Sequence, residues 1–154
     1  MWFLAVFPLL VIDQWSKFWV LRELAVGQSA AWLPGINFHL SFNHGVAFSL
    51  FNKQQALGQG ILLGVIILIS VAVAWALVKN PREDKITALA LTLVLGGALG
   101  NLFDRIYHGY VVDFIDFYIQ HWHWYTFNIA DSFITVGAIL LLFKALFSKE
   151  QEQE

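Results

Sequence analysis

The chain has 154 residues, of which 58% are hydrophobic and only 13% are charged, and its formal net charge is −2. A soluble domain carries about 25% charged residues, so the composition indicates a small polytopic membrane protein. The charge balance offers no basic face for nucleic acid, and the lack of cysteine excludes thiol catalysis, disulfide bonds and thiolate metal sites.

Four apolar segments approach the ~20 residues that a helix needs to cross a bilayer. They lie at about 2–21, 56–78, 86–103 and 131–147. Backbone polar groups cannot stay unpaired in lipid, so each segment is expected to be a helix. The first has neither a basic start nor an A-x-A-like cleavage site, which favours a retained span. We therefore expect one all-α membrane domain over residues 1–154, with outer loops at 22–55 and 104–130.

The orientation follows from the basic residues of the short loops. Lys79, Arg82 and Lys85 lie close together between the second and third spans, whereas the opposite loops carry fewer basic residues over greater lengths. Loops rich in Lys and Arg stay in the cytoplasm, so we expect both termini there as well. The polar residues in or beside the spans then converge on the outer interface: Asp13, Lys17, Asn101, Asp104, Arg105, Asn128 and Asp131.

The first outer loop contains a strand pattern. From Ile36 to Phe42, apolar and polar residues alternate, as in a half-buried strand. Pro34-Gly35 precedes the pattern, and Asn43-His44-Gly45 supplies turn residues after it. A returning strand at Val46–Phe51 would complete a small sheet with one apolar face on the membrane or the bundle.

The second outer loop is rich in aromatic residues between Tyr107 and Tyr125, as in an interfacial belt or a lid over a lipidic substrate. Its His121-Trp-His123 lacks the HExxH pattern, so no metal site is expected. Two small-residue repeats, Gly60-x-x-x-Gly64 and Gly96-x-x-x-Gly100, are expected to let helices pack closely.

Asp113 and Asp131 flank this loop and suggest an aspartic pair. Two carboxylates in one site cannot both ionise cheaply, so one keeps a proton while the other can activate water. The structural alternatives are a helix N-cap for Asp131 and a solvated acid for Asp113. Asp116 competes as a partner, but on a strand Asp113 and Asp116 would face opposite sides, so only one points inward.

The other polar residues of the spans form two pairs at helical spacing. Asp13 and Lys17 are four apart, which allows an ion pair on one face that either positions the first helix or contacts substrate. Asn101 and Arg105 repeat this spacing at the end of the third span. Arg105 is expected either to extend to lipid headgroups or to bind an acid or a carbonyl of the site.

Five motifs, in order along nearly the whole chain, resemble those of signal peptidase II, the bacterial lipoprotein signal peptidase family. They are D-Q-x-S-K at Asp13–Lys17, N-x-G-x-A-F-S at Asn43–Ser49, G-G-A-x-G-N-x-x-D-R at Gly96–Arg105, V-V-D-F at Val111–Phe114 and F-N-x-A-D-S at Phe127–Ser132. The resemblance implies four transmembrane helices, a small periplasmic β-sheet and an interfacial helix.

The resemblance also implies what the site does. Asp113 and Asp131, rather than Asp116, would be catalytic, in a membrane aspartic endopeptidase that needs no cofactor. The substrate would be a prolipoprotein bearing a diacylglyceryl group on its cysteine, cleaved just before that cysteine near the outer face of the inner membrane. Membrane lipid and globomycin-type inhibitors would be further partners. The family pocket would be lined by Asn43, Asn101, Arg105 and Asn128, with Asp13, Lys17 and Asp104 in support.

Two other functions remain open at this stage. One is a small transporter or proton channel in which Asp13, Asp113 and Asp131 relay protons, although the acids gather at one face of the membrane. The other is a non-catalytic factor that binds lipoproteins on the same fold and tolerates loss of either Asp.

Overall fold

The computed structural model of the chain describes residues 2–45 and 55–148. Its four long helices are α1 (Trp2–Glu23), α3 (Gln55–Lys79), α4 (Lys85–Tyr107) and α5 (Ile129–Ser148). All four are long and apolar enough to cross a membrane, which confirms the predicted spans to within a few residues. The largest difference is at the end of α4, which continues past the predicted end at residue 103 because Asp104 is buried inside the protein.

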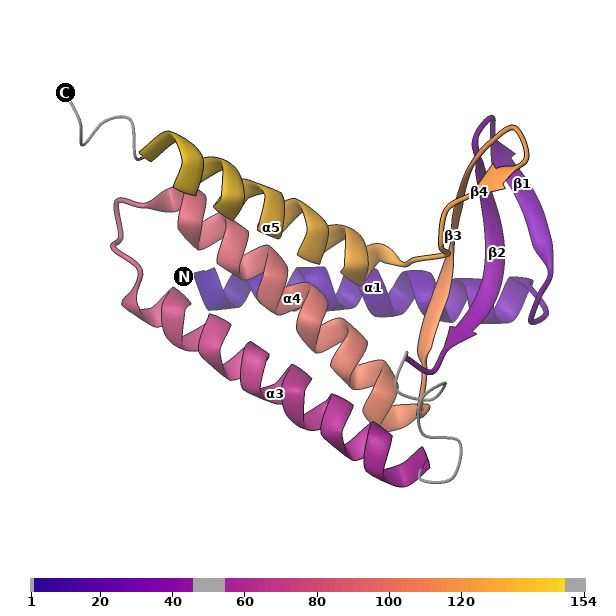
Figure 1. Cartoon of the computed structure of the whole chain (residues 1–154), viewed down its shortest axis with the longest axis horizontal. Helices are drawn as coiled ribbons and strands as arrows, with labels where there is room; N and C mark the ends of the chain where they lie inside the picture. The colour runs from indigo at the N-terminus through magenta and orange to yellow at the C-terminus, as the bar shows by residue number, and fades with distance from the viewer. Residues whose placement is uncertain (1, 46–54, 149–154) are drawn as a thin grey trace.

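Helix α4 lies at the centre of the bundle and packs against α1, α3 and α5 (Figure 1). Glycines allow the close approach: a methyl group at Gly97 would overlap the carbonyl oxygen of Ala130 in α5, and one at Gly100 would overlap the Asp13 carboxylate of α1. The predicted packing face at 96–100 is therefore confirmed. It brings α1, α4 and α5 together where their polar residues lie.

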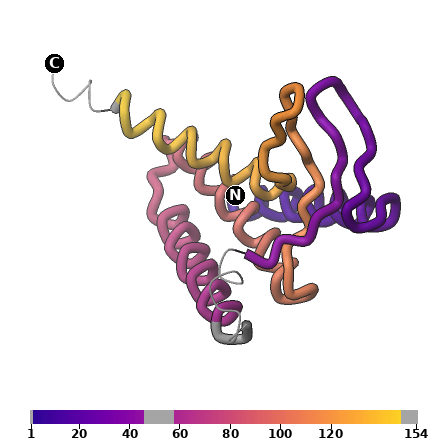
Figure 2. Tube along the Cα trace, turned by 45° about the vertical axis from the view of Figure 1, so that its right-hand side comes forward, coloured from indigo at the N-terminus to yellow at the C-terminus, as the bar shows by residue number. Residues whose placement is uncertain are grey.

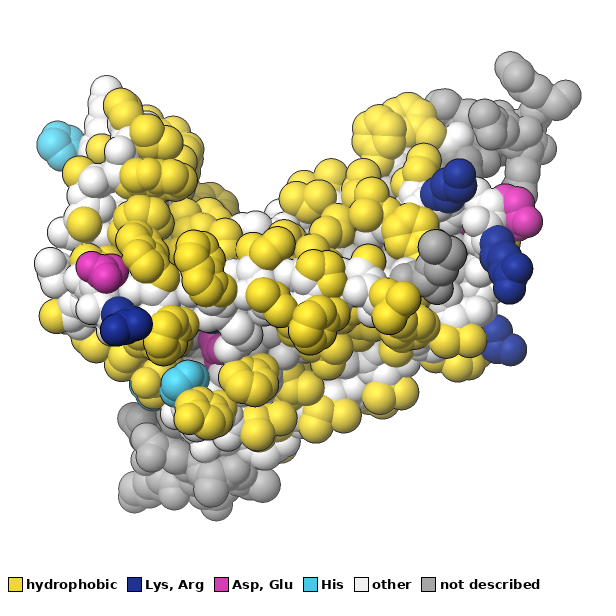
Figure 3. All heavy atoms as spheres, turned by 180° about the vertical axis from the view of Figure 1, so that it is seen from behind, with side chains coloured by type: hydrophobic (Ala, Val, Ile, Leu, Met, Phe, Trp, Pro, Cys, Tyr) yellow, Lys and Arg dark blue, Asp and Glu magenta, His cyan; other side chains and the backbone are white. Residues whose placement is uncertain are grey.

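The prediction for the other small-residue repeat is wrong. No described atom lies within 4 Å of a methyl group built at Gly60 or Gly64, so this face of α3 is open rather than packed. Large apolar side chains are exposed along the helices, and Lys and Arg gather at the end opposite the sheet (Figure 3). Such a surface is suited to lipid contact along the helices and water at their ends.

A four-stranded antiparallel sheet extends from one end of the bundle (Figure 2). Its strands, in spatial order, are β1 (Ser29–Leu33), β2 (Ile36–Asn43), β3 (Val111–Ile119) and β4 (Trp122–His123). Strand β2 confirms the predicted strand, and Gly35 before it adopts a positive φ of 88° in the turn. The expected returning strand at Val46–Phe51 lies outside the described residues. Within residues 2–45 and 55–148 the structure has no helix besides the four long ones, so none there corresponds to the expected interfacial helix.

The sheet joins the two outer loops, which the sequence did not predict. Strand β3 pairs with β2 so that Ser41 lies opposite Asp113. The strands are held by a buried apolar cluster of Val20, Leu40, Val112 and Phe114, which also anchors the sheet to the end of α1. The sheet therefore fixes Asp113 relative to the helices.

The chain then returns along β3 to begin α5. The Phe127 N–H donates to the Ile115 carbonyl at 3.0 Å, and the Ile115 N–H donates back at 2.8 Å. This pairing places the first turn of α5 beside the part of β3 that carries Asp113. The aromatic loop thus doubles back as a hairpin, and its ends meet beside Asp113.

At the opposite end, Asp84 caps α4 and binds α5. Its carboxylate accepts the Thr87 N–H at 3.1 Å, and the Lys144 ammonium donates to Asp84 and, at 2.8 Å, to the Thr87 hydroxyl. The hydrogen bond from Lys144 lowers the pKa of the Asp84 carboxyl. This contact ties the α4 N-terminus to the last turns of α5.

We expect Asp84→Ala to lower the free energy of unfolding by about 1 kcal/mol more than Asp84→Asn, because both lose the ion pair but only Asn still caps the helix. Thermal unfolding in detergent measures the difference, and equal midpoints for the two variants would contradict the cap. Since the pKa of Asp84 is lowered on folding, the ion-pair contribution is present above the ordinary pKa of about 3.9 and is lost as the pH falls below it.

Candidate active site

Asp113 lies on β3 at the end of the sheet nearest the helices. Its side chain is buried, with only 3% exposed. Asn43 of β2 donates to its Oδ2 at 2.9 Å, and Asn128 donates to its Oδ1 at 2.6 Å. Both carboxylate oxygens are therefore held by side-chain amides, which fixes the orientation of the acid.

Asp131 lies in the first turn of α5. Asn128 precedes the helix, and its Oδ1 accepts the Asp131 N–H at 2.9 Å, while Asp131 Oδ2 accepts the Asn128 N–H at 3.3 Å. This reciprocal pair is a capping box. The N-cap is thus Asn128, and the alternative that Asp131 is itself the N-cap is wrong. Asn128 touches both acids, through its side-chain amide and through its backbone.

Asn101 of α4 completes the support of Asp131. Its Nδ2 donates to Asp131 Oδ1 at 2.7 Å, while its Oδ1 accepts from Asn128 at 3.2 Å and from the Lys17 ammonium at 3.2 Å. Both ends of this amide are engaged by protein groups. Asn101 therefore connects the buried charge of Lys17 to Asp131.

The predicted ion pair of Asp13 and Lys17 is confirmed at 2.8 Å, and Lys17 binds Asp104 as well, at 2.9 Å. All three side chains are at most 3% exposed. Buried charges need partners of opposite sign, and here one ammonium serves two carboxylates. None of the three lines the cavity beside Asp113 and Asp131.

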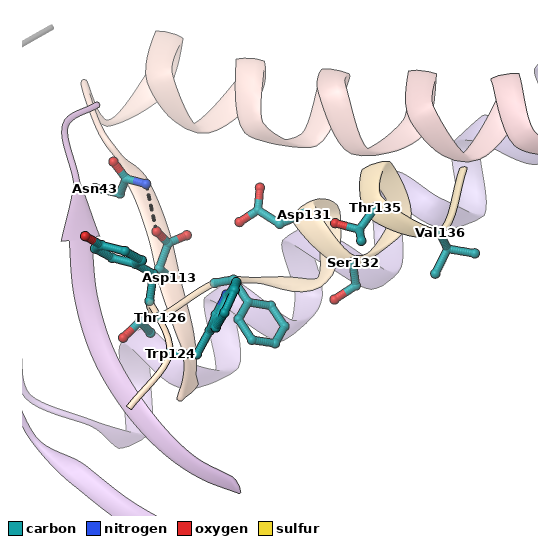
Figure 4. Close-up of a pocket in the computed structure, with 10 residues that line it drawn as sticks. Asn43, Asp113, Trp124, Thr126, Asp131, Ser132, Thr135 and Val136 are labelled. Carbon is teal, nitrogen blue, oxygen red and sulfur yellow. Dashed lines mark hydrogen bonds between the residues drawn. The ribbon is translucent and has the colours of Figure 1, made fainter. Parts of the chain in front are cut away.

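Asp113 and Asp131 line a common cavity of about 540 Å³. Figure 4 shows their carboxylates directed into the same space from β3 and α5. The other lining residues are Asn43, Trp124, Tyr125, Thr126, Phe127, Ser132, Thr135 and Val136. The cavity is polar at the acids and continues along α5, a membrane-spanning helix, so its shape and position fit an amphipathic ligand.

Asp116 lies on the same strand but points elsewhere. It accepts from His123 at 2.9 Å and from Asn37 at 3.3 Å, and it does not line the cavity. Opposite orientations of Asp113 and Asp116 follow from the period of a strand, as predicted. His123, half of the superficially metal-like pair, is thus bound to an acid. Within residues 2–45 and 55–148 no cluster of three or more His, Asp or Glu could hold a metal ion.

Arg105 lies beside this cavity rather than in it. Its Nη1 donates to the Asn101 carbonyl at 3.2 Å, and its buried Nε has no hydrogen-bond partner within residues 2–45 and 55–148. A small separate cavity is lined by Arg105 together with His44, Gln59 and Gly109. A buried donor without a partner is unfavourable, so this guanidinium is suited to donate a hydrogen bond to a ligand oxygen.

Burial is the main reason that the pKa of Asp113 is raised to about 6. The negative charge of Asp131 raises it further, whereas the hydrogen bonds from Asn43 and Asn128 lower it, as does the charge of Lys17. A carboxyl that titrates near neutral pH beside a second carboxyl is suited to exchange protons in a reaction.

Sequence patterns missed Thr126, Thr135 and Val136 of the cavity wall, whereas Trp124 and Tyr125 belong to the aromatic loop that they indicated as an interfacial belt or a lid. Trp124 and Tyr125 are 56% and 90% exposed, although they line the cavity. Thr135 lies one helical turn after Asp131, which is the only signal for it in the sequence. Ser132 donates to the Asn128 carbonyl at 3.1 Å, so its hydroxyl is engaged by the backbone and not by a basic residue.

Comparisons with known proteins agree with the geometry. A family profile described as Signal peptidase (SPase) II matches residues 5–147. The lipoprotein signal peptidase of Alteromonas mediterranea is 40% identical over 94% of this chain and 79% of its own length, and that of Klebsiella aerogenes is 38% identical over 99% and 92%.

Two solved structures are similar in fold. Both are described as bacterial membrane enzymes, determined by the in meso method at 2.3 Å and 1.9 Å. They superpose with TM-scores of 0.82 and 0.83 at 29% and 30% identity. The first covers 98% of this chain and 90% of its own, and the second 93% and 90%.

Proposed function

The chain belongs to the signal peptidase II family, and on that premise we propose that it is an aspartic endopeptidase for prolipoproteins. The family makes it a peptidase of bacterial lipoprotein maturation and a multi-pass bacterial membrane protein. The finer proposal is that Asp113 and Asp131 hydrolyse the peptide bond just before a diacylglyceryl-modified cysteine. The observation that carries it is the convergence of these two acids, Asp113 buried and Asp131 half-buried, on one cavity.

The reaction needs no covalent intermediate. The ionised carboxylate takes a proton from a water molecule, whose oxygen attacks the scissile carbonyl carbon, while the protonated carboxylic acid donates a hydrogen bond to the carbonyl oxygen. When the tetrahedral intermediate collapses, the C–N bond breaks and the departing nitrogen takes a proton from the pair. The two protons belong to the coupled pair and not to one residue.

The asparagines keep the acids in place for this reaction. Asn43 and Asn128 bind opposite oxygens of Asp113, and Asn101 binds Asp131. Because Asn101 is engaged at both ends, we assign it to Asp131 rather than to the substrate. Arg105, whose Nε has no hydrogen-bond partner among the described residues, is the stronger candidate for a substrate carbonyl that lies outside the cavity of the two acids, on the side of Gln59.

The cavity and its surroundings fit a lipid-bearing substrate. Its wall continues along α5 through Thr135 and Val136, with Trp124 opposite (Figure 4). The acyl chains can extend from the part of the cavity along α5 into the bilayer, so the protein need not enclose them. A cyclic peptide of the globomycin type would compete for the same space.

The proposed orientation has both termini in the cytoplasm and the acids near the periplasmic face. It is supported by the position of the start of α1, the end of α5 and the α3–α4 connection at one end of the bundle, opposite the sheet (Figure 1). A topology reporter fused at Asn80 tests it, and activity characteristic of the periplasm at that position would reverse the orientation.

The decisive test of function uses purified protein and a precursor prepared with and without the diacylglyceryl group. We expect cleavage of the modified precursor alone, with mass spectrometry placing the new N-terminus at the modified cysteine. Equal cleavage of both precursors, or cleavage elsewhere, would contradict the proposed substrate.

A further prediction concerns the pH dependence of the acids. Asn43 donates to Asp113 and thereby favours its ionised form, so Asn43→Ala should raise the pKa of Asp113. The alkaline limb of kcat/KM, which we expect at or above pH 6, should then move to higher pH. Rates measured from pH 4.5 to 9 test this, and a limb that moves to lower pH would contradict it.

A further inference from the structure

Two buried carboxylates outside the cavity each hold the backbone directly before a catalytic acid. Asp13 Oδ1 accepts the Ala130 N–H at 2.9 Å, and Ala130 immediately precedes Asp131. Asp104 Oδ2 accepts the Val112 N–H at 3.1 Å, and Val112 immediately precedes Asp113. The same relation thus occurs twice, once on α5 and once on β3.

Both carboxylates also bind one ammonium group. Lys17 Nζ lies 2.8 Å from Asp13 and 2.9 Å from Asp104. The positions of the two N–H groups are therefore tied to one charge on α1, through side chains that are at most 3% exposed. Charge-assisted hydrogen bonds of this kind are short and directional. They join the start of α5 at Ala130 to the start of β3 at Val112.

We propose that Lys17, Asp13 and Asp104 are positioning residues that set the separation of the two catalytic carboxylates through the backbone. They do not touch the cavity and so do not contact the reacting atoms. Hydrolysis requires both acids to reach one water molecule and one carbonyl, and a misplacement of about 1 Å can lower the rate about 100-fold. This inference rests on the proposed function for its kinetic consequence, although the geometric claim stands apart from it.

A matched pair of variants at Asp104 separates positioning from charge. Asp104→Asn and Asp104→Leu both remove the charge and have similar size, but only Asn can still accept the Val112 N–H. We expect kcat within about tenfold of wild type for Asn and at least about 100-fold lower for Leu, with KM within about threefold for both. Equal losses of kcat in the two variants would overturn the proposal.

Two further measurements keep the test decisive. Lys17→Arg retains the charge, so the variant should fold. Its planar guanidinium changes the spacing between the Asp13 and Asp104 carboxylates and should lower kcat without raising KM. An unchanged kcat would overturn the proposal even if Asp104→Leu did not fold. Amide hydrogen exchange at Val112 should accelerate in Asp104→Leu and not in Asp104→Asn. Because this readout needs no substrate, it decides the geometric claim even if the wild type failed to cleave the precursor.

Discussion

Asp113→Asn and Asp131→Asn are each expected to lower kcat at least about a thousandfold while the protein remains folded in the membrane. An amide cannot take a proton from water at neutral pH, and with one acid left the pair cannot present an ionised and a protonated group together. The substitutions conserve size, so the cavity that both residues line should keep its shape. KM should therefore change little.

Asp116→Asn is the matched control for this experiment. Asp116 lies on the same strand as Asp113 and is similarly buried, but it contacts Asn37 and His123 outside the cavity. We expect kcat within about threefold of wild type. Purified variants are compared on the diacylglyceryl-modified precursor, with helicity measured by circular dichroism. Normal cleavage by Asp113→Asn or Asp131→Asn would rule out the aspartic pair, and an equally inactive Asp116→Asn would show that the wrong partner was assigned.

Asp113→Asn should also remove a pH dependence of stability. Since folding raises the pKa of Asp113 to about 6, the folded chain retains this proton while the unfolded chain releases it near pH 4. Stability from this group therefore falls as the pH rises towards 6, and above that the buried carboxylate remains a cost. The Asn variant has no carboxylate to titrate, so its unfolding midpoint should not show this fall between pH 4 and 6, whereas at one pH its NH2 group faces the donor of Asn43 or Asn128 and lowers stability.

The spans were the most predictable part of the fold, because hydropathy and length act over each segment alone. The alternation at Ile36–Phe42 predicted β2 for the same reason. The wrong prediction at Gly60 and Gly64 shows the limit of this approach, because small residues permit close packing but do not select which helix faces them. Gly97 packs closely because Ala130 of α5 lies opposite.

The meeting of Asp113 with Asp131 was not predictable from local pattern. It depends on the pairing of β2 with β3, whose contacts join residues as far apart as Ile36 and Phe117, and on the return of Phe127 beside Ile115. These contacts join separate segments, so the pattern of apolar and polar residues within one segment cannot predict them. The choice of Asp113 over Asp116 needed only the alternation of a strand once β3 was known.

Asn128 contacts both acids, and this leads to the second large effect. We expect Asn128→Ala and Asn128→Ser both to lower kcat about 100-fold or more, because each removes the amide that donates to Asp113. Only Ala also removes the side-chain oxygen that caps α5 at the Asp131 N–H. Ser is among the preferred N-cap residues, so the Ala variant should be less stable than the Ser variant by about 1 kcal/mol.

The comparison separates two roles of one side chain. If Asn128 supported the site only as a helix cap, Ser would restore most of the activity that Ala loses. If it acts on the carboxylates, as its 2.6 Å contact with Asp113 indicates, Ser restores stability and leaves kcat low. Thermal unfolding and kcat measured on the same preparations distinguish these outcomes. Near-wild-type cleavage by Asn128→Ser would show that the Asn128 side chain acts only as the N-cap of α5. The hydrogen bond from Asn43 would then suffice to orient Asp113.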